Sequence, residues 1–567
     1  MALLHIVLYP SLGDRTDSFP VSRDRAKKEG GVRLHRTQRF LWNGTVTAVS
    51  SLLLRGIGMG FQVYLSRMLG AGGIGLFSLV MSVYTLAVTF AASGINLGAT
   101  RIIAEERGKQ NENGVSRALH SALCYAAIFG GAAAIFLLIG SHSIGVSWLQ
   151  DVRTVSPLRL LALSLPPLAF ANVCNGYFTA CRSAYKNAIL GITCECVRMG
   201  TSILLLRLWL HRGTQYACLA LAGGNCAAEV SDALLCAILL IYARRSERRK
   251  AHSRTNTAQT TAGVTRRLLR VSLPIACTAY VRSALLTLEH ILIPLGLRQS
   301  GDSAAQALAA YGTVHGMVLP AILYPMAFLS AFAALLVPEL AEYHVRGDNR
   351  AILRLCSRGC KITLLFGIGV CGVFLCCAPL LGHVLYDSQQ AGYYLHALGI
   401  LTPLMYLDHI VDAMLKGLDE QLASMRYNIL DAALCVLAVY FLLPRFGIRA
   451  YLWILIGSEL FNLSLSVSRL LRVVRMPLHP IRQIALPVLC SVAAQYIACG
   501  IMHFCEKLFS YGFWSLFFLV CTSLTVYTAF LRLCGCIGVE DLAVFCRLFR
   551  KKDKPQRRNA HRILPHF

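Results

Sequence analysis

The stretch Leu52–Gly75, LLLRGIGMGFQVYLSRMLGAGGIG, decides the fold because it suits the interior of a bilayer and yet carries an arginine, Arg55. The chain around it has 567 residues, of which 56% are hydrophobic and only 15% are charged. Soluble domains carry about 25% charged residues. Several apolar runs exceed about 18 residues, the length that spans hydrocarbon. The composition therefore predicts an all-α polytopic membrane protein.

Fourteen apolar spans can be placed along the chain. They are predicted near residues 40–65, 76–98, 118–140, 158–180, 188–206, 217–242, 271–296, 312–337, 362–385, 394–415, 427–443, 450–468, 484–504 and 512–531. With the N-terminus inside, 43 of the 55 Lys and Arg residues fall in cytoplasmic segments, 8 in outer loops and 4 in spans. Basic residues collect on the cytoplasmic side, so this bias predicts that both ends lie inside.

Changes in composition divide the chain into six predicted segments. These are a basic cytoplasmic arm at 1–39, an N-lobe of helices 1–6 at 40–242, a cytoplasmic linker at 243–270, a C-lobe of helices 7–12 at 271–468, helices 13–14 at 469–531 and a basic cytoplasmic tail at 532–567. The lobes resemble each other, because Arg55 and Arg282 take equivalent positions and the Ala-Glu pairs at 104–105 and 341–342 end the second helix of each. Transporters built from such repeats bind substrate between them, so we expect two pseudo-symmetric lobes around a central cavity.

The charge and the cysteines exclude other classes of protein. The net charge of +27 is spread over loops and both ends, without the aromatic-interleaved basic stretches that stack bases, so no nucleic-acid partner is expected. The 22 cysteines lie mostly in apolar spans without metal-site spacing, so no metal is expected. The absence of a phosphate-binding loop followed by Lys-Ser or Lys-Thr argues against ATP. No cofactor is predicted, and a Na⁺ gradient, a H⁺ gradient or the membrane potential is the alternative energy source.

One long stretch carries a family resemblance. NGTVTAVSSLLLRGIGMGFQVYLSRMLGAGGIGLFSLVMSVYTLAVTFAASGINLGATRIIAE, from Asn43 to Glu105, resembles the opening of the polysaccharide-transporter branch of the MOP exporter superfamily. It is most similar to the stage V sporulation protein B group and more distantly to MurJ-type lipid II flippases. The resemblance covers roughly residues 39–530. It implies a protein of the bacterial cytoplasmic membrane with two six-helix lobes that open alternately to each side, plus two C-terminal helices.

The resemblance also implies a cargo. Members of this family move lipid-linked saccharides, so we expect an alternating-access flippase for a polyprenyl-diphosphate-linked saccharide or peptidoglycan precursor, used for cell-wall, spore-cortex or surface polysaccharide. The lipid-linked oligosaccharide or lipid II-like substrate, the bilayer and cell-wall synthesis enzymes are the candidate partners. Arg55 matches the first arginine of the MurJ-type pattern, whereas Phe61 and His315 stand where that pattern has further arginines. These departures favour a related flippase over the lipid II flippase itself.

Charged residues inside spans are the candidate site residues, because they are costly in lipid unless they face a wet cavity or a partner. A guanidinium stays charged and binds phosphate oxygens bidentately. The predicted substrate-binding residues are Arg55, Gln62, Arg198, Arg282 and His315. Structural roles are the alternative. Arg198 would pair with Glu195, Arg282 would pair with Glu289 or another acid, and His315 would be an ordinary packed histidine.

Carboxylates inside spans are candidates for cation coupling. The predicted residues are Glu289, Asp408 and Asp412. The alternative for Asp412 is an ion pair with Lys416, one turn further along the helix. No catalytic residue is predicted.

Two other functions stay open. A MATE-type cation-coupled antiporter of drugs or small molecules would have a site that leans acidic and aromatic, whereas the first, fifth and seventh spans here present arginine. A membrane enzyme that acts on lipid-linked sugars would need catalytic carboxylates on a sizeable outer domain. The predicted outer loops are short, so we expect a transport protein and not an enzyme.

Overall fold

The computed structural model describes residues 23–109, 111–181, 183–250, 261–476, 481–505 and 512–536, and within these every regular element is helical. The helices are α1 (Arg23–Ala92), α2 (Ile95–Gly108), α3 (Glu112–Ser143), α4 (Val155–Ala162), α5 (Leu165–Ala180), α6 (Ala184–Trp209), α7 (Thr214–Lys250), α8 (Thr261–Gln299), α9 (Ala304–Gly312), α10 (Leu319–Leu323), α11 (Met326–Arg346), α12 (Asn349–Tyr386), α13 (Gln389–Leu398), α14 (Leu401–Gly417), α15 (Gln421–Val474), α16 (Leu486–Cys505) and α17 (Phe513–Leu533). Short π-helical segments lie at Ile144–Trp148, Thr313–Val318 and Ile481–Ala485, and 3₁₀ turns at Val152–Thr154 and Leu210–Arg212.

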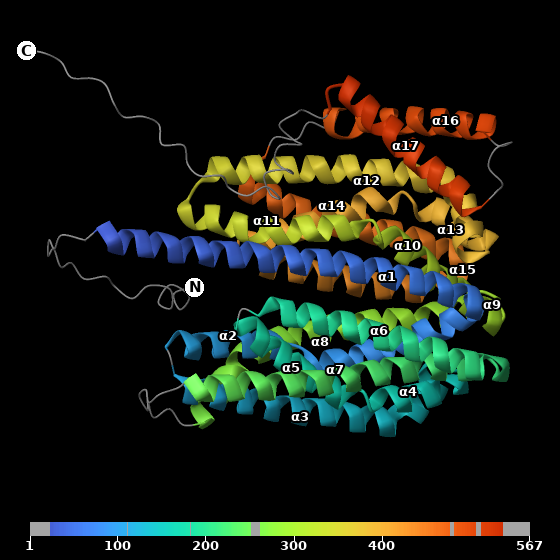
Figure 1. Ribbon diagram of the computed structural model, residues 1–567. Helices are drawn as coiled ribbons and strands as arrows, with labels where there is room; N and C mark the ends of the chain where they lie inside the picture. The colour runs from blue at the N-terminus through green and yellow to red at the C-terminus, as the bar shows by residue number, and fades with distance from the viewer. Residues whose placement is uncertain are drawn as a thin grey trace, which may run out of the picture.

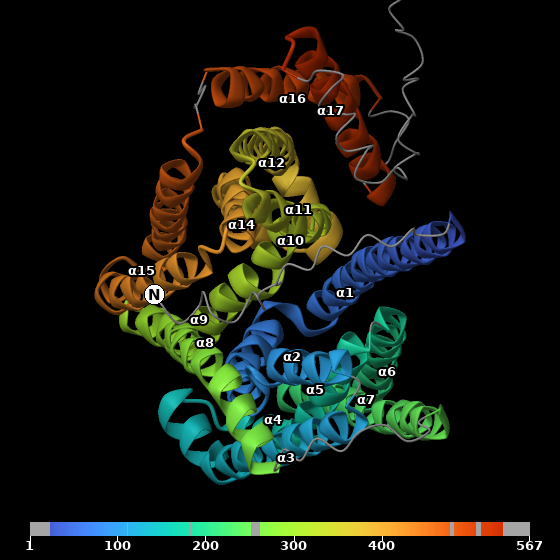
Figure 2. The same ribbon diagram turned by 90° about the vertical axis from the view of Figure 1, so that its left-hand side faces the viewer.

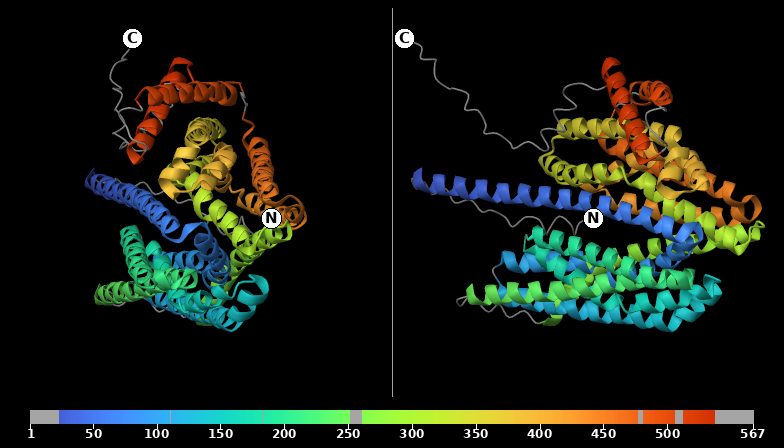
Figure 3. Two further views of the ribbon diagram at one scale, coloured as in Figure 1. Left: turned by 90° about the vertical axis from the view of Figure 1, so that its right-hand side faces the viewer. Right: turned by 45° about the vertical axis from the view of Figure 1, so that its right-hand side comes forward.

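The helices gather in two bundles (Figure 1). The N-terminal bundle consists of the second half of α1 with α2–α7, and the C-terminal bundle consists of α9–α15. The first half of α1 and the whole of α8 lie between the bundles (Figure 2). The α16–α17 pair lies at the edge of the C-terminal bundle (Figure 3) and packs on α12 through a small apolar core that includes Leu365 and Tyr527. The all-α architecture agrees with the sequence prediction.

Eleven helices among the described residues are long and apolar enough to cross a membrane, and the number rises to thirteen if each of two bent pairs forms one span. The longest candidates, Leu54–Gly108 and Gln421–Val474, have 55 and 54 residues. A straight helix of that length would measure about 81 Å, more than twice the ~30 Å of bilayer hydrocarbon. Both are kinked at a glycine with positive φ, Gly70 at 67° and Gly447 at 59°. The count of fourteen and the inside location of both ends remain predictions.

Prolines break two of the predicted spans. Pro166 and Pro167 occupy the first turn of α5, and α5 is bent by 44° from the helix before it. The span predicted at 312–337 contains the π-helical segment Thr313–Val318 and is interrupted between α10 and α11 at Pro325. Both interruptions fit the inability of proline to donate a backbone hydrogen bond inside a helix.

The predicted segment boundaries meet the helices as follows. Helix α1 begins at Arg23, inside the expected arm, and residues 1–22 lie outside the described residues. Helix α7 extends into the expected linker as far as Lys250, and α8 begins within it at Thr261. Residues 251–260, which connect the two helices, also lie outside the described residues. Most of the tail, beyond residue 536, is likewise not described. The division into six segments remains a prediction.

Candidate functional site

The two bundles meet where the second half of α1 crosses α9. A Cβ atom on Gly75 would lie 2.1 Å from the carbonyl oxygen of Leu308, and one on Gly312 would lie 2.1 Å from that of Ala71. Neither position therefore has room for a side chain. Small residues let helix backbones approach closely inside membranes, and here they join the bundles backbone to backbone.

Polar side chains of α1 strengthen the contact at the same end of the molecule. Gln62 Nε2 donates a hydrogen bond to the carbonyl oxygen of Gly316, at 2.7 Å. The guanidinium of Arg67 donates to Leu385 O at 2.9 Å and also to Val384 O, carbonyls in the last turn of α12 that lack helical partners. Gln62, a predicted substrate residue, therefore holds the bundles together in this conformation.

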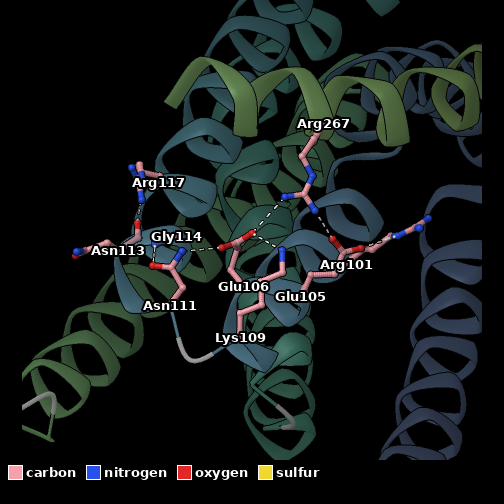
Figure 4. A network of polar contacts seen from close by, with 9 residues as sticks. All are labelled: Arg101, Glu105, Glu106, Lys109, Asn111, Asn113, Gly114, Arg117 and Arg267. Atoms are coloured by element: carbon pink, nitrogen blue, oxygen red, sulfur yellow. Dashed lines mark hydrogen bonds and ion pairs between the residues drawn. The ribbon is translucent and has the colours of Figure 1, made fainter. Parts of the chain in front are cut away.

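At the opposite end the bundles are joined by α8. The guanidinium of Arg267, near the start of α8, donates to the carboxylates of Glu105 and Glu106 at the end of α2 (Figure 4). Farther along α8, Glu289 is buried in the C-terminal bundle, where Cys435 Sγ donates to its carboxylate at 3.2 Å. Helix α8 thus begins on the N-terminal bundle and ends in the C-terminal one, as Figure 2 shows.

Arg55 lies on the first half of α1, between these two ends. Its side chain is exposed and forms no hydrogen bond or ion pair with any described residue. A Cβ on the adjacent Gly56 would lie 3.5 Å from Tyr324 Oη, so this turn of α1 lies next to the break between α10 and α11. Arg55 therefore lies on a part of α1 that is close to the C-terminal bundle, and its contact with substrate remains a prediction.

The C-terminal bundle adds a histidine and a lysine that the sequence analysis did not select as site residues. His409 of α14 lies close enough to Arg55, Lys416 and Asp412 for their charges to act on its imidazole, and its Nε2 lies 3.1 Å from Ser330 Oγ. Lys416 is exposed. His409 and Lys416 are seven residues apart and so share one helix face, which is the signal that could have found them. Arg55, His409 and Lys416 form what we call the cationic surface.

The other predicted arginines have different surroundings. Arg198 forms an ion pair with Glu195, three residues before it on α6, as the structural alternative had it. Arg282 is exposed and does not pair with Glu289. Instead its charge acts on Asp408 and Asp431. Arg198 is therefore paired within its own helix, whereas Arg282 acts on carboxylates of α14 and α15, and substrate binding by either arginine remains a prediction.

His315 lies in a cluster of aromatic rings inside the C-terminal bundle. Its Nε2 is hydrogen-bonded to Tyr451 Oη, and its ring centroid lies 4.6 Å from that of His290. His290 Nδ1 lies 3.0 Å from Tyr311 Oη. Each imidazole thus has a phenol partner, which satisfies a polar group away from water. Substrate binding by His315 remains a prediction.

Two predicted coupling residues of α14, Asp408 and Asp412, are hydrogen-bonded to neutral side chains. Asp408 accepts from Asn462 Nδ2 at 3.0 Å, and Asp412 accepts from Ser424 Oγ at 2.7 Å rather than pairing with Lys416. The charges of three aspartates, Asp412 among them, act on Glu459. In the part of the chain that the structure describes, no three His, Cys, Asp or Glu side chains meet as metal ligands would. Cation coupling by Glu289, Asp408 and Asp412 remains a prediction.

Two helical bundles that share a charged interface inside the membrane define a transport protein, and comparisons with known proteins agree. The chain is 23% identical over 476 residues to stage V sporulation protein B of Bacillus subtilis (strain 168), covering 82% of this chain and 91% of that protein. The fold is similar to that of lipid II flippase MurJ in an inward closed conformation, with a TM-score of 0.61 and 12% identity over 89% of this chain and 100% of that one. It is also similar to an inward-facing MATE family transporter of the MOP superfamily, with a TM-score of 0.57 and 15% identity over 74% and 96%.

The family follows from a match over more than half of the chain. Residues 40–344 match the family described as "Polysaccharide biosynthesis protein", and the chain belongs to this family. The predicted resemblance to the MOP superfamily and to the sporulation group is thereby confirmed. The chain is a multi-pass protein of the cytoplasmic membrane, and its relatives support the prediction of a transport protein that is not an enzyme.

Proposed function

We propose that this protein is an alternating-access flippase that moves a polyprenyl-diphosphate-linked saccharide or peptidoglycan precursor across the cytoplasmic membrane. The observation that carries the proposal is the cationic surface, in which Arg55 of α1 has no ionic partner among the described residues and lies close to His409 of the other bundle. Membership of the polysaccharide biosynthesis family supports the class of cargo.

The chemistry of the cargo explains these residues. A diphosphate is a dianionic group that must leave water to cross a low-dielectric slab, so its charge must be neutralised on the way. A guanidinium remains protonated and offers paired donors to phosphate oxygens, while Lys416 adds a second fixed charge. Because Arg55 comes from the first half of α1 and the other two residues come from the C-terminal bundle, bound diphosphate would contact both elements. Movement of the bundles against each other would then expose the site to one side and then to the other.

We also propose fourteen crossings with both ends inside. The candidate spans give this number when the two longest are divided at Gly70 and Gly447, and when each bent pair and the run from α9 to α11 count as one crossing. In this orientation the contact of Gly75 with Gly312 closes the outer side. The basic-residue bias of the sequence supports the same orientation.

The test is flipping by purified protein in proteoliposomes, with a fluorescent polyprenyl-diphosphate saccharide as the probe. Arg55→Ala and His409→Ala should each slow flipping by about tenfold or more, since each removes one charged or polar phosphate contact. Arg207→Ala, which removes an exposed arginine at the far end of α6, is the control and should flip at the wild-type rate. Wild-type flipping by Arg55→Ala would refute the proposed site.

A cation-coupled antiporter is the second candidate, favoured by the group of carboxylates around Asp408, Asp431 and Glu459 and by the MATE-like fold. The same vesicles distinguish the two. An antiporter would export a cationic dye on an imposed Na⁺ or H⁺ gradient, would lose this activity in Asp408→Asn, and would be indifferent to the lipid-linked saccharide.

A further inference from the structure

A groove lies between the two halves of α15, apart from the cationic surface. It has a volume of about 690 Å³ and is lined along one face of each half, mostly by apolar side chains such as Leu434, Leu442 and Ile454. On the first half its lining runs from Asp431 to Phe446, a helical distance of about 22 Å at 1.5 Å per residue. The groove is therefore long and mostly apolar.

The two ends of the groove differ in charge. At one end Asp431 accepts a hydrogen bond from Ser458 Oγ at 2.8 Å. At the other end lies Arg449, which is exposed and follows the kink at Gly447. Arg445, also exposed, is on the other side of the same turn. An anionic group would be repelled by the carboxylate end and attracted to the arginine end.

The arginine end also has the character of a membrane surface. Trp453, one turn after Arg449, lines the groove and is 72% exposed, and tryptophan is enriched at the level of lipid head groups. In the proposed orientation this turn lies outside, where the sequence has only 8 basic residues, two of them Arg445 and Arg449. Two of these eight basic residues therefore lie at the arginine end of the groove, where they would attract an anionic head group.

We propose that this groove binds one acyl chain of an anionic phospholipid from the outer leaflet, with the phosphate at Arg449 and Arg445. One leaflet of a ~30 Å hydrocarbon core is about 15 Å thick, so an acyl chain fits the length of the groove. A groove about 22 Å long with a volume of about 690 Å³ suits one acyl chain. The inference rests on the proposed orientation but not on the cargo.

The experiment measures lipid binding to the full chain by native mass spectrometry, with phosphatidylglycerol and phosphatidylcholine of identical acyl chains as probes. Wild type should bind phosphatidylglycerol about tenfold more tightly, and Arg445→Gln with Arg449→Gln should abolish that preference. Arg207→Gln is the matched control, because it also removes an exposed outer arginine and should leave the preference intact. Equal binding of both lipids by wild type would overturn the proposal.

A second variant tests the apolar part of the groove. A Cβ on Gly457, which lines the groove, would meet no atom within 4 Å, so Gly457→Phe should fold and fill the space. It should weaken binding of both phospholipids while the thermal transition of the lipid-free protein stays unchanged. Retention of wild-type lipid binding by Gly457→Phe would also overturn the proposal. Neither measurement requires flipping, so the lipid-binding proposal can fail while the proposed function stands, and the reverse.

Discussion

The passage from α2 to α3 and the passage from α11 to α12 take the same place in the two halves of the chain, and they are built alike. Asn111 Oδ1 accepts a hydrogen bond from the backbone N–H of Gly114 at 3.0 Å, and Asp348 accepts one from that of Ala351 at 3.0 Å. Each N-cap comes six residues after the glutamate of the Ala-Glu pair. The equal spacing supports the predicted repeat.

The surroundings of the two passages differ. Glu106 is 1% exposed and lies within 3.0–3.4 Å of Asn111, Lys109 and Arg267 (Figure 4). Its counterpart in the second passage is Tyr343, and the nearby Glu342 is exposed and pairs with Arg346 of its own helix. The local turn is therefore common to both repeats. Of the two passages, only the first has a buried carboxylate at this place, where α8 packs against α2.

The largest expected effect comes from Glu106→Ala. This change leaves Arg267 and Lys109 without their buried partner and removes the group that orients the N-cap amide of Asn111. We expect a loss of about 2–3 kcal/mol in the free energy of unfolding, measured by thermal denaturation in detergent. Glu342→Ala is the matched change in the other passage and should cost less than about 0.5 kcal/mol. Equal losses would show that burial by α8 is irrelevant.

Arg267→Ala should have the next largest effect. Its side chain is 38% exposed, so loss of its two ion pairs should cost about 1 kcal/mol, a value reduced by solvent screening. Arg270→Ala, which removes an exposed arginine of the same helix, should be nearly neutral. The double variant Glu106→Ala with Arg267→Ala should lose less stability than the sum of the two single losses, by about 0.5 kcal/mol or more, because both single changes break the same ion pair. Simple additivity would break the proposed link between α8 and α2.

These interactions mark how far the sequence could be interpreted. The pairing of Arg198 with Glu195 was foreseeable because i, i+3 spacing places both on one helix face. The partner of Glu106 is 161 residues away along the chain, and no local pattern connects the two. The helices themselves were predictable, since apolar length decides them. The breaks at Gly70 and Gly447 fall within residues 66–75 and 444–449, which the sequence analysis left between predicted spans. The sequence did not show that each break would be a single glycine with positive φ in an otherwise continuous helix.

The candidate site shows the same division. A lone arginine in an apolar helix indicated that Arg55 should avoid lipid, and the structure places it at the bundle interface. The repeat suggested the same role for Arg282, but its neighbours Asp408 and Asp431 come from α14 and α15. Equivalent positions in a repeat share a backbone, while the charges around them depend on long-range packing.

Gly347→Ala sharpens the comparison of the two helix ends. Helix α11 ends at Gly347 with φ of 71°, a left-handed conformation that costs other residues about 1–2 kcal/mol. Helix α2 ends instead through Lys109 with φ of −79°. We expect Gly347→Ala to lower the free energy of unfolding by about 1 kcal/mol. Gly108→Ala in the first passage, where a Cβ meets nothing within 4 Å, should be neutral or slightly stabilising, and thermal denaturation of the pair would show whether the two ends are equivalent.

The smallest expected difference concerns the two basic residues that end these helices. Lys109 is 55% exposed but pairs with the buried Glu106, whereas Arg346 is 64% exposed and pairs with the exposed Glu342. Solvent screens both pairs, so Lys109→Ala should cost about 0.5 kcal/mol and Arg346→Ala about 0.2 kcal/mol or less. Denaturation at low and high salt distinguishes them, because salt screens an exposed pair more than one with a buried member. The stability loss of Lys109→Ala could instead depend on salt as strongly as that of Arg346→Ala. Glu106 would then behave as a surface carboxylate, and the two passages would differ only in how their first helices end.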